Sequence, residues 1–95
     1  MQLNRFDLNL LIALDALLRE KNVTRAAERV FVSQPAMSAA LHKLREYFND
    51  PLLVRVGREM ELTSRGESLV EPVREALLRI QMMLGNQPTF DPKTA

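Results

Sequence analysis

A break in the hydrophobic pattern at residues 31–33 constrains the fold of this chain more than any other feature. The residues before it, 23–30, have helical spacing and are bounded by capping residues. After the break, Ser33 is a favourable N-cap, and Pro35 falls in a first helical turn, where a missing N–H costs nothing. The pattern predicts two short helices, 23–30 and 34–48, joined by a tight connection.

Three further segments complete the order of elements. An apolar pattern with helical spacing predicts a first helix at 7–20. Two short strand-like runs within 52–63 predict a hairpin, with Gly57 placed for a type II′ turn. A last helix is expected over 64–84, with a kink or a lost hydrogen bond at Pro72. This order predicts a mainly α winged helix-turn-helix followed by a long helix.

Capping residues mark the ends of these helices. Asn22 is placed to cap the second helix, and either Thr63 or Ser64 to cap the last one. Glu67 would complete a capping box with Ser64, and Gly85 is placed to end the helix. The expected organisation is a winged helix-turn-helix domain at 1–63, a linker helix at 64–85 and a polar hinge or tail at 86–95.

The outward face of the helix at 34–48 begins with short side chains. Its expected inward stripe consists of Met37, Leu41, Leu44 and Phe48. Pro35, Ser38 and Ala39 then face outward, and short side chains let a helix sink into a DNA major groove about 12 Å wide. Gln34 is suited to a bidentate contact with adenine. The alternative is an ordinary surface helix whose small residues have no function, and the pattern favours DNA.

Basic and polar residues elsewhere add to the DNA interpretation. Arg58 is expected at the hairpin tip, where it would enter a minor groove or bind a phosphate, although solvated turn arginines are equally common. The net charge of +1 and the small local basic excess favour a solvated mixed surface when charge is taken alone. The candidate DNA-contacting residues are Thr24, Ser33, Gln34, Pro35, Ser38, Ala39, His42, Lys43, Arg45, Arg55 and Arg58.

The last helix predicts a homodimer, because its apolar stripe is longer than a small core can cover. The first helix has a second apolar side, which is covered either by the same domain or by a partner chain. The candidate dimerisation residues are Ile12, Ala16, Leu69, Val73, Ala76, Leu77, Ile80 and Leu84.

Other classes of function find little support. The chain has no cysteine, which excludes disulfides and thiolate metal sites, and no cofactor or metal is expected. No window is apolar enough to span a membrane and no export signal is apparent, so a cytoplasmic location is expected. His42 is the only histidine and no nucleophile or phosphate-loop motif accompanies it, so an enzyme is not expected. A purely protein-binding helical module remains an alternative.

Several motifs together resemble the N-terminal domain of LysR-type transcriptional regulators. They are residues 24–30 and 32–38, the opening Phe6–Leu11, and Leu62-Thr63 followed by Gly66. The resemblance covers about residues 4 to 85.

One branch of the family is matched most closely. Residues 38–41, with Arg45 and Asp50, resemble the branch of nodulation-gene activators and regulators of aromatic-compound degradation. Many other members carry a longer polar residue where this chain has Ala39.

The resemblance implies more than the pattern alone. It implies that the helix bearing Gln34, Pro35 and Ser38 enters the major groove and that Arg58 enters the minor groove. It also implies that the linker helix pairs two subunits on double-stranded DNA with an interrupted palindrome. Full-length members carry a C-terminal effector-binding domain and commonly form tetramers. This chain is then a DNA-binding fragment, and any small-molecule inducer would bind only to the missing C-terminal domain.

Overall fold

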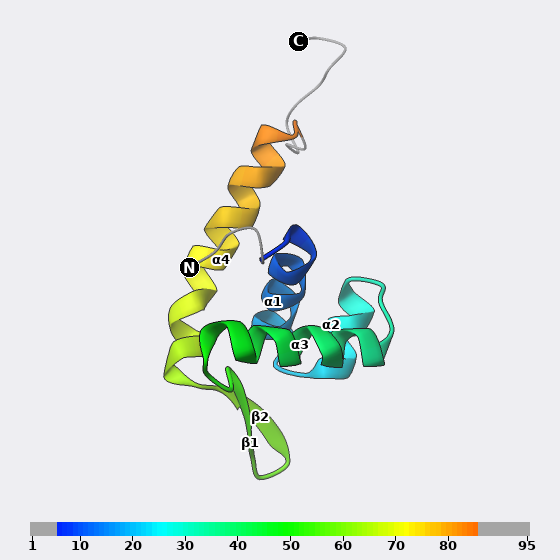
Figure 1. Ribbon diagram of the computed structural model, residues 1–95, viewed down its shortest axis with the longest axis vertical. Helices are drawn as coiled ribbons and strands as arrows, with labels where there is room; N and C mark the ends of the chain where they lie inside the picture. Colours follow the sequence, from blue (N-terminus) through cyan, green and yellow to red (C-terminus); the bar gives the residue numbers. More distant parts are fainter. Residues whose placement is uncertain (1–5, 86–95) are drawn as a thin grey trace.

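The computed structural model describes residues 6–85, which form four helices and one antiparallel hairpin (Figure 1). In chain order the elements are α1 (Leu8–Glu20), α2 (Val23–Arg29), α3 (Gln34–Phe48), β1 (Leu53–Val56), β2 (Glu59–Leu62) and α4 (Ser64–Met83). The predicted winged helix-turn-helix with a long last helix is confirmed. The tail predicted for 86–95 lies outside the described residues.

Side-chain caps begin the helices, as local sequence rules require. The side chains of Asn22 and Ser33 accept hydrogen bonds from backbone N–H groups three residues on, at 2.8 and 3.2 Å. Of the two candidates for α4, Thr63 is the cap, because its Oγ1 accepts from the N–H of Gly66 at 3.0 Å. The capping box predicted between Ser64 and Glu67 is therefore wrong, since the third helical position is occupied by Gly66.

The core lies where α1 meets the other three helices. Figure 1 shows α1 beside α4, with α3 crossing below them and α2 on the far side of α1. Side chains from α1, α3 and the start of β1 fill the centre, each less than 2 % exposed. The largest of them are Leu14, Leu17, Met37, Leu44, Leu52 and Leu53. Burying such side chains contributes about 1.5–3 kcal/mol each, so the core fixes which face of α3 is turned outward.

The hairpin formed by β1 and β2, here called the wing, projects from one end of the molecule (Figure 1). Leu53 pairs with Leu62 at its base, and Val56 pairs with Glu59 beside the two-residue turn. The first turn residue, Gly57, has φ +66°, as a type II′ turn requires. The wing therefore presents Arg58 at the end farthest from the core.

Helix α4 leaves the core at the opposite end of the molecule (Figure 1). Pro72 lies inside it, so the carbonyl of Ser68 lacks its usual N–H partner four residues on. Gly85, with φ +79°, follows its end and donates its N–H to the carbonyl of Met82 at 3.1 Å. Within residues 6–85 no helix is both long and apolar enough to cross a membrane.

Candidate nucleic-acid interface

The first two turns of α3 present only short side chains to solvent. Pro35, Ser38 and Ala39 are all exposed, whereas Met37 and Leu41 on the opposite side are buried. The rotation of α3 thus turns its short side chains outward. A helix with such a face can approach another molecule closely along its backbone.

Polar groups on this face are linked to one another. The amide Nε2 of Gln34 donates a hydrogen bond to Oγ of Ser38 at 3.2 Å. One N–H and the carbonyl oxygen of the amide remain free, and these are the groups that pair with the N7 and N6 edge of adenine. Two turns further on, His42 lies 3.6 Å from Glu46, and both side chains are more than two-thirds exposed.

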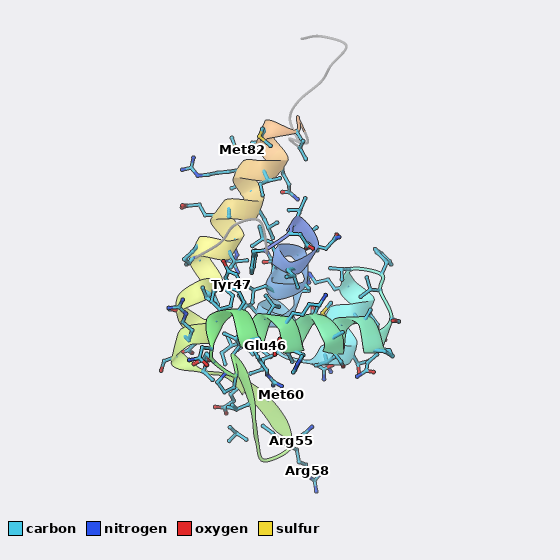
Figure 2. The ribbon with its side chains drawn as sticks, in the orientation of Figure 1. Glu46, Tyr47, Arg55, Arg58, Met60 and Met82 are labelled. Atoms are coloured by element: carbon cyan, nitrogen blue, oxygen red, sulfur yellow. The ribbon has the colours of Figure 1, made fainter. Side chains whose placement is uncertain are left out.

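A groove separates the wing from the junction of α1 and α2. Its volume is about 730 Å³. It brings together four of the predicted DNA-contacting residues, Thr24, Gln34, Arg55 and Arg58. In Figure 2, Arg55 and Met60 lie along one side of the wing and Arg58 extends beyond its tip.

The groove also contains basic residues that were not among the predicted sites. Lys21 and Arg25 line it, and no ion pair occupies either of them among the described residues. Two acids line it as well: Glu20, whose carboxylate is bonded to Arg29 at 2.8 Å, and Glu59 on β2. The sequence did contain a signal for Lys21 and Arg25. They lie on either side of Asn22, the cap of the helix that precedes the one expected to enter the major groove.

Arg45 differs from the other candidate DNA-contacting residues, because two nitrogens of its guanidinium are bonded within the chain. It was predicted to contact a DNA phosphate, but its Nε donates to the carbonyl of Pro51 at 2.8 Å and its Nη2 to that of Leu53 at 2.9 Å. These two bonds tie the guanidinium to the base of the wing, and its contact with a phosphate stays a prediction. Lys43 is exposed on the same helix and no such contact holds it.

The predicted dimerisation residues fall into two groups. Ala16 and Val73 are only 0 and 6 % exposed, inside the core of their own chain. Ala16 leaves no surface for a second chain, so that prediction is wrong. Val73 keeps a small accessible surface that lines the hollow described below, so it stays a prediction. Ile12 and Leu84 are exposed, and the rest are partly buried along α4: Leu69, Ala76, Leu77 and Ile80.

The structure shows two further apolar surfaces, made mostly of residues that were not among the predicted dimerisation residues. Leu78, Met82 and Met83 are more than half exposed on the last turns of α4. A separate apolar hollow of about 430 Å³ lies between α1, α3 and α4. Its lining includes Phe6, Leu8, Leu11, Tyr47, Phe48 and Ile80.

One exposed aromatic residue had no signal in the sequence. Phe31, in the turn between α2 and α3, is 93 % exposed and has φ 60°, a conformation that favours glycine. Periodicity says only that Phe31 ends one helix before another begins. Within residues 6–85, no group of His, Cys, Asp or Glu side chains is arranged to hold a metal ion.

Comparison with known proteins identifies the family. Residues 8–67 match the family described as bacterial regulatory helix-turn-helix protein, lysR family. The chain is 53 % identical over 92 residues to nodulation protein D of Bradyrhizobium sp. (strain ANU 289), covering 97 % of this chain and 27 % of that protein. It is also 53 % identical over 92 residues to nodulation protein D 1 of Rhizobium tropici, covering 97 % of this chain and 30 % of that protein.

Solved structures agree in fold. A probable transcriptional regulator from Pseudomonas aeruginosa matches with a TM-score of 0.81 and 40 % identity, over 98 % of this chain and 31 % of that one. The BenM DNA-binding domain, in a complex with catB site 1 DNA, matches with a TM-score of 0.77 and 25 % identity, over 84 % of this chain and 90 % of that one.

The chain belongs to the LysR family of transcription regulators, and it is the helix-turn-helix DNA-binding domain of that family. It spans less than a third of the length of the curated relatives named above. These relatives are regulators rather than enzymes, which is the class expected from the sequence.

Proposed function

We propose that the chain binds double-stranded DNA sequence-specifically as a homodimer and thereby regulates transcription in the bacterial cytoplasm. In this proposal α3 enters the major groove and the wing enters the adjacent minor groove. The target is an interrupted palindrome, and the chain is the DNA-binding part of a longer regulator. Inducer binding and tetramer formation belong to the part of that protein beyond this chain.

The observation that supports the proposal best is the exposed, short-side-chain start of α3. A duplex can approach the backbone there, because Pro35, Ser38 and Ala39 leave little bulk in the way. Gln34 and Ser38 then bring hydrogen-bonding groups to the base edges, and they are already bonded to each other. Prior ordering of a side chain reduces the entropy lost when it binds.

The groove beside the wing supports a phosphate contact on the flank of the site. Arg25, Arg55 and Arg58 line it together with the hydroxyl of Thr24, and these groups are suited to phosphate oxygens. Such contacts would place the duplex without reading its sequence. They also explain how a chain with a net charge of only +1 could bind a polyanion.

The homodimer is supported by the apolar surface along α4. Twenty residues give a helix of about 30 Å, and its last turns carry Leu78, Met82 and Met83 in solvent. A second copy of the chain would cover these side chains and the hollow beside Tyr47. Two reading helices related by a two-fold axis require two half-sites in inverted orientation.

Selection of bound sites from random DNA tests the proposal. The expected product is a pair of inverted half-sites. For each tenfold rise in salt concentration, the logarithm of the affinity should fall by about 0.9 per phosphate neutralised. Retention of no sequence, or binding that does not respond to salt, would refute DNA recognition. The first result would favour the alternative of a module that binds other proteins.

A matched pair of variants then locates the reading surface. Ser38→Ala should weaken binding to the selected site by about 1–3 kcal/mol and leave binding to random DNA nearly unchanged. Ser68→Ala, the same change at an exposed position of α4, should leave binding to both the selected site and random DNA unchanged. Equal losses on selected and random DNA for Ser38→Ala would remove this face of α3 from base reading.

A further inference from the structure

The orientation of the wing depends on how its base is held. A two-stranded hairpin is marginally stable by itself, and β1 and β2 pair only with each other. Beyond Leu53, the wing side chains packed against the core are the partly buried Met60 and Leu62, both on β2, and most of the others are exposed. On β1, where residues 54–56 are exposed, the restraint on the direction of the wing comes from hydrogen bonds at its base.

A single carboxylate oxygen joins the two ends of the wing. Oδ2 of Asp50, in the loop before β1, accepts a hydrogen bond from Oγ1 of Thr63 at 2.7 Å. The same oxygen accepts from the N–H of Leu52 at 2.8 Å. These bonds lower the pKa of Asp50 from its ordinary value, first through the Thr63 hydroxyl and then through the Leu52 amide. The carboxyl group therefore remains charged at neutral pH.

The base of the wing is also hydrogen-bonded to α3. Arg45, on α3, donates to the carbonyls of Pro51 and Leu53 on either side of Leu52. Leu52 has φ 65° and is 1 % exposed, and its carbonyl accepts from the N–H of Thr63 at 2.9 Å. The base of the wing is thus connected to α3 on one side and to the first turn of α4 on the other.

We propose that Arg45, Asp50 and Thr63, here called the latch, are positioning residues that fix the wing relative to α3. They act through Arg58 and touch no DNA themselves. The latch sets the distance between the side chain of Arg58 and the short-side-chain face of α3, so that both meet one duplex. This inference rests on the proposed DNA binding described above.

A double-mutant cycle on DNA affinity tests the latch. Arg58→Ala should weaken binding to the selected site and reduce the magnitude of the log–log salt slope by about 0.9, the contribution of one phosphate. Asp50→Ala should reproduce both effects, because it leaves Arg58 present but misdirected. The double variant should then bind about as well as Arg58→Ala alone, since coupled residues give non-additive losses.

Two controls separate positioning from general damage. Asp15→Ala removes a partly buried carboxylate paired with Arg19 on α1, and it should leave the salt slope unchanged. In Asp50→Ala, the preference at the base read by Gln34 should persist, because α3 itself is undisturbed. If Asp50→Ala does not fold, Arg45→Gln replaces it in the cycle, with the same expected losses. Arg45→Gln should fold, because it leaves the Asp50–Thr63 hydrogen bond in place.

The outcomes are distinct for the two proposals. If the unaltered chain selects no DNA, the proposed function fails. If it binds its selected site but the losses from the latch variant and Arg58→Ala add, the latch does not act through Arg58 and this inference is overturned. A latch variant that loses base preference together with affinity would also overturn it, because the effect would then lie in α3.

Discussion

Replacing Gly66 by alanine sets two opposed effects against each other. Gly66 lies in the first turn of α4, and glycine in a helix is about 1 kcal/mol less favourable than alanine. Helix propensity alone therefore predicts that Gly66→Ala stabilises the chain. The position is buried, however, and an added Cβ would lie 2.7 Å from the backbone carbonyl oxygen of Leu52.

The steric effect should be the larger one. A backbone carbonyl cannot rotate away as a side chain can, and that of Leu52 is already bonded to the N–H of Thr63. Overpacking of this kind costs about 1–3 kcal/mol. Displacing the carbonyl would also weaken a hydrogen bond worth about 1 kcal/mol. After the gain in propensity, we expect a net loss of about 1–3 kcal/mol.

Thermal unfolding measures this balance. For a domain of this size each kcal/mol lowers Tm by roughly 4–8 °C, so a clear decrease is expected. Ser68→Ala, at an exposed position two residues further along α4, should leave Tm unchanged or slightly raised. A Gly66→Ala chain that melts at or above the unaltered Tm would show that Leu52 can move freely, and it would undermine the account of the wing base as rigid.

Three further predictions concern other parts of the molecule. Because the pKa of Asp50 is lowered from 3.8, its contribution to stability is present above that pH and is lost as pH falls through the still lower folded value. Asp50→Asn should therefore unfold more easily in urea near about pH 7, and its difference from the unaltered chain should shrink as the pH falls below 3.8; a constant difference would contradict the assignment. Met83→Glu should yield monomers with unchanged helix content, since it puts an unpaired charge at the proposed interface; sedimentation showing intact dimers would place the interface elsewhere. Leu44→Ala should destabilise the chain by about 2–5 kcal/mol in urea unfolding, because the side chain is fully buried; a loss below about 1 kcal/mol would mean that the core collapses around the gap.

The sequence predicted features that depend on near neighbours. The caps at Asn22 and Ser33 and the positive φ at Gly57 follow from residues within a few positions, so local rules were sufficient. The same rules left the start of α4 open between Thr63 and Ser64. The structure selects Thr63, whose hydroxyl also bonds Asp50 thirteen residues earlier, and that partner is invisible to a local pattern.

What the sequence missed depends on tertiary neighbours. Periodicity shows on which side of α1 Ala16 lies, but not which elements bury it. In the structure α1 packs against three helices, and Ala16 is fully buried. Likewise, Arg45 was assigned to DNA because basic residues near a reading helix commonly bind phosphate. Its partners within the chain are carbonyls of a chain reversal that the sequence does not place in space.

The length of α4 amplifies any change in the orientation of its first turn. The helix begins at the base of the wing and ends at the opposite end of a molecule 52 Å long, so a small rotation at its first turn becomes a large displacement at its tip (Figure 1). Over about 30 Å of helix, a tilt of about 10° moves the far end by about 5 Å. In the proposed dimer, that end carries the interface residues Met83 and Leu84, so the packing of Gly66 against Leu52 would set the span between the two proposed DNA-reading surfaces. The tolerated spacing between half-sites is then a measure of how stiff that single turn is.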